Sequence, residues 1–280
     1  MLTLGYIEDM HSVVVGASPY AGEAKPKEGV NIIPGMSVIE YQSAAEKYET
    51  ARQNAMGEDV QFYQKIGNTA YITFDSFDLI PRSGDYEIDM ANEIVDTITL
   101  ISAAHVAISN DPEIENVVLD LSCNGGGAAD AAIYTVAWML GYCNLSTYDS
   151  VTESRSTISY LADVNFDGVF DKNDSISDKN LFCLVSPVSF SCGNLVPAIL
   201  KASNEVTIIG KPSSGGGCPV HHGVTADGTI FNISSSKQLT TVKNGTYYSI
   251  DSGVEPHYTL THVESFYDRQ VLTEYINGLK

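Results

Sequence analysis

The stretch that decides the fold is Asn116–Ala132, with the sequence NVVLDLSCNGGGAADAA. Its first six residues are almost all apolar and are bounded by polar turns, which is typical of a strand buried on both faces of a parallel sheet. The glycines of Asn124–Gly127 predict a tight loop, and Ala128–Leu140 predicts a helix. This order of buried strand, glycine loop and helix indicates an α/β fold.

The same order recurs outward from this stretch in both directions. Leu181–Ser186 is a second apolar run, and it is followed by a predicted helix from about Gly193 to Ala202. Strands are also predicted at Thr69–Phe77 and Val206–Gly210, and helices at Val38–Met56, Tyr86–Ser109 and Tyr267–Leu279. Because strands alternate with helices, we expect a mixed, largely parallel sheet, with a small N-terminal α+β portion before it.

Composition limits the possible partners. The 280 residues include 35 Asp and Glu against 15 Lys and Arg, a formal net charge of −20. Such a surface argues against nucleic acid and against anionic membranes, since both are bound by Lys and Arg. No run of about 18 apolar residues predicts a membrane-spanning helix, and the first residues do not form a signal peptide. The 44% hydrophobic content excludes wholesale disorder.

The segment DVNFDGVFDKND has the spacing of a calcium loop. Oxygen-bearing side chains stand at loop positions 1, 3, 5, 9 and 12, namely Asp163, Asn165, Asp167, Asp171 and Asp174. Gly168 stands at the sharp turn, and Val169 would offer its backbone carbonyl. Aspartate at position 12 departs from the common EF-hand and resembles dockerin-type loops. We expect a structural calcium ion in an insertion at about residues 160–178; the alternative is a metal-free surface turn.

A serine follows the second buried strand, in LFCLVSPVSFSCGN. Ser191 would lie at the junction of strand and helix, where its Oγ is exposed and helix N-terminal amides can stabilise an oxyanion. The N–H of Cys192 would be one donor. The glycines after Asn124 let backbone amides approach a substrate closely. Taken singly, such a serine is more often a helix N-cap, and three glycines are more often a turn.

Taken together, the two blocks resemble the tail-specific, or C-terminal-processing, serine peptidases. NVVLDLSCNGGG is similar to the family signature LDLRxNxGG, and the segment with Ser191 is similar to its nucleophile block. The resemblance covers about residues 66–262. It implies a crotonase-like (ClpP-like) ββα core, a polypeptide substrate and Ser191 as nucleophile. It also places Gly126 and Gly127 where the family has its other oxyanion donor.

The general base is where the sequence departs from the bacterial members. Their lysine has no counterpart in Ser213–Gly217, and Lys211 precedes the glycines. The segment IEDMHSVVV instead resembles the tricorn-like branch, in which an early histidine is the base. That resemblance implies His11 as base, with Ser12 beside it to polarise it. Asp251 stands one residue beyond the place of the branch's orienting glutamate, and is the candidate to orient the imidazole.

The resemblance also indicates how the chain is divided. Residues 1–65 would form an N-terminal portion that carries His11 and is too short to include a PDZ domain. Residues 66–280 would form the peptidase core. A start so close to the catalytic base predicts that part of the natural protein lies upstream, and the calcium loop predicts a secreted or cell-surface protein.

The leading prediction is therefore a serine endopeptidase that cleaves polypeptides without a catalytic cofactor, and the resemblance implies cleavage near their C-termini. Three alternatives stay open: a non-catalytic binding protein on the same fold, an esterase or lipase, and a calcium-dependent adhesion module. The esterase would use the near-GxSxG segment Ser189–Gly193 with His257 as its base. We expect His221 and His222 to be a solvated pair, and His105 to be a core residue. The sequence does not indicate an oligomeric state.

Overall fold

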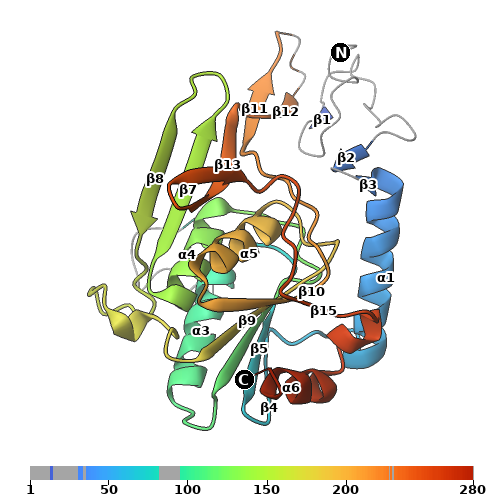
Figure 1. The fold of residues 1–280 in the computed structure, drawn as a ribbon, viewed down its shortest axis with the longest axis vertical. Coiled ribbons are helices and arrows are strands. Elements are labelled where there is room, and N and C mark those ends of the chain that lie inside the picture. Colours follow the sequence, from blue (N-terminus) through green and yellow to red (C-terminus); the bar gives the residue numbers. More distant parts are fainter. Residues whose placement is uncertain are drawn as a thin grey trace.

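The computed structural model describes residues 13–14, 31–33, 36–81, 95–226, 228 and 230–279 (Figure 1). Its central sheet has six strands: β4 (Tyr63–Ile66), β5 (Thr69–Thr73), β6 (Asn116–Asp120), β9 (Asn180–Val185), β10 (Val206–Gly210) and β15 (Tyr258–Thr259). Their order across the sheet is β15-β10-β9-β6-β5-β4. Only the β4–β5 pair is antiparallel; the four other pairs are parallel. The prediction of a mixed, largely parallel sheet is confirmed.

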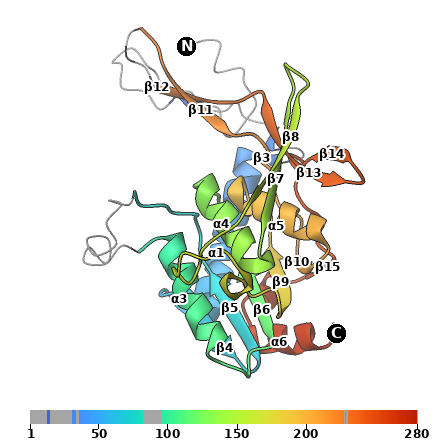
Figure 2. The same cartoon turned by 90° about the vertical axis from the view of Figure 1, so that its left-hand side faces the viewer.

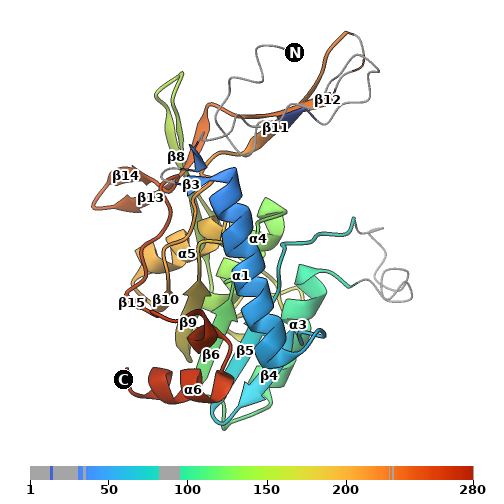
Figure 3. The same ribbon diagram turned by 90° about the vertical axis from the view of Figure 1, so that its right-hand side faces the viewer.

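Helices cover both faces of this sheet. They are α1 (Val38–Met56), α3 (Thr97–Ser109), α4 (Ala129–Leu140), α5 (Cys192–Ser203) and α6 (Arg269–Asn277), with short 3-10 turns η2 (Lys172–Asp174) and η3 (Val263–Phe266). One hydrophobic cluster joins α3, α4 and α5 to one face of the sheet, and a second joins α1, η3 and α6 to the other. Figure 3 shows α1 and α6 on the face turned away from α3 and α4.

Strand β6 shows why the middle of this stretch, Val117–Leu119, is apolar at successive positions. Val117 and Leu119 pack into the cluster with α3, α4 and α5, whereas Val118 packs into the cluster with α1 and α6. All three side chains are completely buried. Because successive side chains of a strand point to opposite faces, a strand with a helical layer on each side needs apolar residues at every position.

The remaining strands form three smaller sheets at one end of the α/β body (Figure 2). The antiparallel sheet β14-β13-β7-β8 consists of β7 (Cys143–Asp149), β8 (Arg155–Tyr160), β13 (Lys237–Lys243) and β14 (Thr246–Ser249). The sheet β1-β12-β11 consists of β1 (Val13–Val14), β11 (Val220–Val224) and β12 (Ile230–Ser234), and a two-stranded sheet pairs β2 (Asn31–Ile33) with β3 (Met36–Ser37). None of the described helices is both long and apolar enough to span a bilayer.

The prediction of one helix over Tyr86–Ser109 was wrong at Val95 and Asp96, which are not helical. Residues 82–94 lie outside the described part, but α3 begins only at Thr97. Asp96 is its N-cap and has an extended backbone, with φ −140° and ψ 179°. The apolar periodicity of the sequence continues across Asp96. However, because its side chain accepts the N–H of Thr99, Asp96 caps the N-terminus of α3, and the helix begins directly after it.

Candidate active site

Ser191 has a backbone conformation that is unfavourable for a residue with a side chain. It directly precedes α5, with φ 54° and ψ −120°. Its N–H donates to the carbonyl of Gly215 at 2.9 Å, and its own carbonyl accepts the N–H groups of Asn194 and Leu195 at 2.9 and 2.8 Å. Strain of this kind persists only where surrounding contacts enforce it, and it is concentrated at functional sites.

The strained turn also exposes the serine selectively. Between residues 188 and 200, all of which the structure describes, Ser191 is the one residue that is not buried. It stands at the N-terminal end of α5, where the first N–H groups of a helix lack intrahelical partners and carry a partial positive charge. The fold therefore presents a hydroxyl where negative charge is stabilised.

The glycine loop after β6 lies against this serine. A Cβ added to Gly126 would stand 2.7 Å from Ser191 Cβ and 3.1 Å from its Oγ, so only glycine fits there. The N–H of Gly126 donates to Asn124 Oδ1 at 2.9 Å. In the part of the chain that the structure describes, no acceptor takes the N–H of Gly127 or of Cys192. Those two groups remain available to an oxyanion.

Two thiols near the site are held neutral. Cys192 Sγ donates to the carbonyl of Gly127 at 3.2 Å, and burial raises the pKa of this thiol to about 12. Burial likewise raises the pKa of Cys123, in the loop after β6, to about 12. Since a cysteine attacks only as its thiolate, neither side chain competes with Ser191 as nucleophile near neutral pH.

A second glycine segment separates Ser191 from Asp251. Gly215 accepts the N–H of Ser191, and a Cβ added to Gly215 would meet the backbone oxygen of Asp251 at 1.8 Å. The N–H of Gly217 donates to Asp251 Oδ1 at 2.8 Å. The Gly215–Gly217 segment thus contacts the Ser191 backbone and Asp251 alike. Asp251 itself is exposed.

A buried asparagine, which the sequence analysis missed, joins these parts. Asn194 in α5 donates from Nδ2 to the carbonyl of Ile250 at 2.9 Å, and its Oδ1 accepts the Ser213 hydroxyl at 2.7 Å. Ser213 Oγ in turn accepts the N–H of Val254 at 2.7 Å. The only signal in the sequence was a polar residue in an otherwise apolar helix, which does not reveal partners 19 or more residues away.

Comparison with known proteins identifies the family. The model of peptidase family S41 matches residues 68–260, well over half of the chain. The chain belongs to peptidase family S41. The resemblance to C-terminal-processing peptidases, which rested on the two glycine- and serine-bearing blocks, is confirmed at the level of the family.

Solved structures share the fold of this S41 chain. The photosystem II D1 C-terminal processing protease matches with a TM-score of 0.52 and 22% identity over 69% of this chain and 42% of its own. Mature CPAF complexed with lactacystin matches with a TM-score of 0.53 and 12% identity, over 75% and 50%. A structure from Parabacteroides merdae, assigned only provisionally as a peptidase, matches with a TM-score of 0.61 and 14% identity, over 99% and 80%. At these identities the likeness shows the fold alone.

A curated relative is similar over a shorter region. A Chlamydia pneumoniae protein is 34% identical to the S41 chain over 103 residues, which are 36% of this chain and 16% of that protein. The chain therefore spans only part of the length of several proteins that it matches, including half of CPAF.

The histidines of the S41 chain have different environments. The predicted base His11 and its neighbour Ser12 lie outside the described residues; Val13, which follows them, pairs with Asn232 of β12. His257 Nδ1 accepts the N–H of Ile208 at 2.9 Å, and partial burial lowers the pKa of this imidazole. That hydrogen bond fixes His257 to β10 and gives it a structural role.

The predicted calcium loop lies between β8 and β9 of the S41 chain. Asp163 Oδ2 accepts the N–H of Gly168 at 2.9 Å, while Asp163 Oδ1 is buried and has no hydrogen-bond partner among the residues that the structure describes. The buried Asp174 accepts N–H groups of the loop, from Val164 at 2.8 Å and Asp171 at 2.9 Å. Across the described residues, no three His, Cys, Asp or Glu side chains converge in a group that could hold a metal ion.

Proposed function

We propose that this chain is a serine peptidase that hydrolyses polypeptides, with Ser191 as its nucleophile. The observation that carries the proposal is the strained, selectively exposed Ser191 beside two backbone N–H groups without acceptors, those of Gly127 and Cys192. The hydroxyl oxygen would attack the scissile carbonyl, and the two N–H groups would stabilise the oxyanion that forms. Membership of family S41 supports this reaction.

The similarity to a C-terminal processing protease supports cleavage near the C-terminus of the substrate. A crotonase-like core would carry this chemistry: parallel strands β6 and β9 each lead into a loop of the site, Asn124–Gly127 after β6 and the turn with Ser191 after β9. The N-terminal portion, residues 1–65, would supply the base and the peptidase core, residues 66–280, would supply the nucleophile.

A serine hydroxyl needs a base, and we assign that role to His11, as in the tricorn-like branch. His11 would take the Ser191 proton and deliver it to the leaving amine, with Ser12 polarising the imidazole. Asp251 would orient the ring, and its position beside the Gly215–Gly217 segment supports this role. The lysine of the Ser–Lys branch has no counterpart in Ser213–Gly217, and Lys211, which precedes these residues, is the lysine nearest to its place.

Steady-state hydrolysis of an unstructured peptide separates these assignments. We expect Ser191→Ala and His11→Ala each to lower kcat about 10⁶-fold. Lys211→Ala is the matched control and should retain activity, as should folded Ser189→Ala. Loss of activity in Lys211→Ala together with an active His11→Ala would contradict the Ser–His assignment.

We further propose that the loop from Asp163 to Asp174 binds a structural calcium ion. The spacing of its oxygen ligands and the buried, unpartnered Asp163 Oδ1 support a cation there. Asn165, Asp167, Asp171, Asp174 and the Val169 carbonyl would complete the ligand set. Such a site fits a secreted or cell-surface protein, which fractionation of the source cells into cytosol, envelope and medium would test.

Terbium luminescence tests the calcium site, because Tyr134 donates to the Asp163 carbonyl at 3.4 Å and can sensitise a bound lanthanide. Emission excited through tyrosine should appear with Tb³⁺, be displaced by Ca²⁺, and disappear in Asp163→Asn. Asp149→Asn, a half-buried aspartate outside the loop, is the control. Equal emission from the Asp163→Asn protein and the native one would contradict the site.

A further inference from the structure

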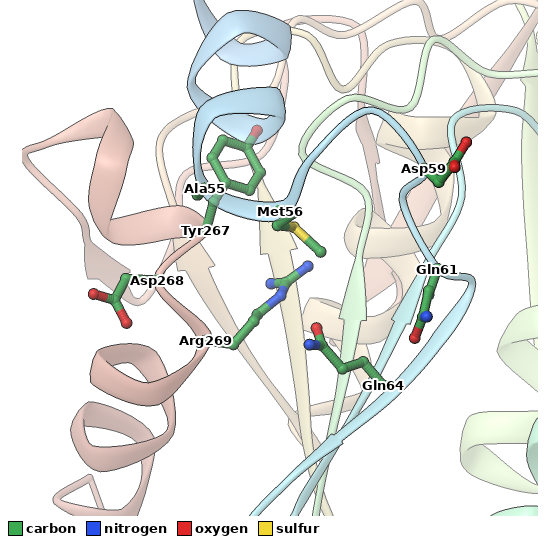
Figure 4. Close-up of a pocket in the computed structure, with 8 residues that line it drawn as sticks. All are labelled: Ala55, Met56, Asp59, Gln61, Gln64, Tyr267, Asp268 and Arg269. Carbon is green, nitrogen blue, oxygen red and sulfur yellow. The ribbon is translucent and has the colours of Figure 1, made fainter.

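A cavity of about 520 Å³ lies on the side of the sheet covered by α1 and α6 (Figure 4). It is bounded by Met56 at the end of α1, Gln64 on β4, Tyr267 directly after η3, and Arg269 at the start of α6. Figure 4 shows the guanidinium of Arg269 between Met56 and Gln64. Arg269 is only 5% exposed, so the structure buries a cation next to this cavity.

The buried arginine is paired with the end of β6. Arg269 Nη2 donates to Asp120 Oδ2 at 2.5 Å and to Thr73 Oγ1 at 3.1 Å, and its guanidinium carbon lies 4.4 Å from the centre of the Tyr71 ring. Asp120 is completely buried at its side chain. A buried ion pair gives little net stability, because both charges lose their hydration; its best-attested use is to specify one arrangement.

The ion pair between Arg269 and Asp120 fixes the conformation at the start of the loop that lies beside Ser191. The other oxygen of Asp120, Oδ1, accepts the N–H of Ser122 at 2.9 Å. Tyr267 reaches the same place, with its hydroxyl 3.1 Å from Ser122 Oγ and 3.3 Å from Cys123 Sγ. Burial raises the pKa of Tyr267, so this hydroxyl stays protonated and able to donate.

From Ser122 the contacts continue to the reacting groups. The Ser122 carbonyl accepts the hydroxyl of Ser186, at the end of β9, and the Asn124 carbonyl accepts the N–H of Phe190 at 3.1 Å. Asn124 also fixes Gly126 through its side chain. A displacement at Ser122 would therefore move the glycines relative to Ser191.

We propose that Tyr267 and Arg269 are positioning residues for the oxyanion loop, residues 122–127. Tyr267 acts through Ser122, and Arg269 acts through Asp120. Neither side chain touches a reacting atom, and Arg269, the first residue of α6, lies 78 positions beyond Ser191 in the sequence. This inference rests on the proposed peptidase function. Its consequence is that the start of α6 sets how well Gly127 and Cys192 meet the oxyanion, while the binding of the ground-state peptide is left unchanged.

Tyr267→Phe tests the proposal with the loss of a single hydroxyl. We expect kcat to fall about tenfold, less than the 10²–10³ typical of a deleted oxyanion donor, with KM unchanged. The inhibition constant of a peptide boronate, which forms a tetrahedral adduct with serine, should rise by the same factor. A merely structural role would lower the folded fraction but would not change the boronate affinity of the folded protein.

Tyr48→Phe is the matched control. Tyr48 is 3% exposed and packs in the same hydrophobic cluster as Tyr267, but its hydroxyl has no hydrogen-bond partner. It should keep native kcat and boronate affinity. Unchanged kcat in Tyr267→Phe, or an equal loss in Tyr48→Phe, would overturn the positioning role. An inactive native protein whose Ser191 resists labelling would instead overturn the proposed function, and this inference with it.

Arg269 is tested by chemical rescue, because removing it leaves the Asp120 charge buried and unpaired. We expect kcat to fall at least as far in Arg269→Ala as in Tyr267→Phe. Millimolar guanidinium chloride, which can enter the adjoining cavity, should restore part of the kcat of Arg269→Ala. The same salt should not restore Tyr267→Phe. Folded Arg269→Ala with native kcat would contradict the role of the arginine.

Discussion

Ser191 has its left-handed φ for a different reason from Asn204, which ends α5. Asn204 has φ 62° at a helix C-cap, where asparagine commonly adopts this conformation. Ser191 has no such local reason, and its conformation costs on the order of 1–3 kcal/mol. The hydrogen bond to Gly215, far along the chain, keeps it in place. No sequence pattern encodes a strain that depends on so distant a partner.

Gly126→Ala should slow the reaction strongly without unfolding the protein. The added methyl would stand 3.1 Å from Ser191 Oγ, so we expect kcat to fall about 10²-fold or more, as when an oxyanion donor is lost. Gly57→Ala is the matched control, because Gly57 also has a positive φ, 84°, but nothing lies within 4 Å of its added Cβ. Comparable activity in the two folded variants would contradict the proposed geometry.

His105 should make stability depend on pH. Its Nδ1 accepts the Trp138 indole N–H at 3.3 Å, and burial lowers its pKa from the ordinary 6.5, against weaker opposing effects of the Asn173 carbonyl and Asp174. Below about pH 6.5 the unfolded chain binds a proton that the native state does not, so the free energy of unfolding falls as pH falls.

His105→Gln removes that proton site while retaining polar atoms. Urea unfolding at about pH 7 and pH 5 should show a smaller loss of stability in this variant than in the native protein. His257, whose pKa is lowered in the same direction, is common to both proteins and cancels. Equal losses in the two proteins would show that His105 does not contribute.

Among the elements, those buried on two faces were the most predictable. The apolar runs in the sequence of β6 and β9 predict that both strands are buried. Strands buried on both faces lie in the interior of a parallel sheet, which is where the structure has them. Helix α1 was predicted with its observed bounds, because its sequence is rich in helix-forming residues such as alanine, glutamate and glutamine. The start of α3 was missed because Asp96 lies within a continuous apolar pattern, and a cap competes with that pattern through one side chain.

Asp96→Ala should destabilise the protein through this cap. Asp96 Oδ1 accepts the N–H of Thr99 at 3.1 Å, and its Oδ2 accepts the N–H of Ile80 at 3.1 Å. Loss of an N-cap costs about 0.5–2 kcal/mol, and we expect the upper part of that range because the N–H of Ile80 also loses its acceptor. Asp96→Asn, which keeps an acceptor, should retain most of the stability in urea unfolding. Native stability in the alanine variant would contradict this.

At the scale of the whole molecule, the site is assembled from segments that are far apart in sequence. Motif spacing identified Ser191 and the glycines, because each follows a recognisable strand. It could not identify Asn194 or Tyr267, since nothing local distinguishes them from other buried polar residues. Their roles depend on long-range contacts, such as the 145 positions between Tyr267 and Ser122. Net charge only predicts which classes of partner are disfavoured, and the geometry around Ser191 gives the positive argument for a peptidase.

The central claim is that Ser191 is an activated nucleophile. A fluorophosphonate probe, followed by proteolysis and mass spectrometry, tests it most directly. We expect one adduct per chain, on Ser191, that is absent from Ser191→Ala and retained by folded Ser189→Ala. Two results would contradict the assignment of Ser191 as nucleophile. One is the absence of an adduct on a folded chain that includes residues 1–65, and the other is an adduct that persists in Ser191→Ala.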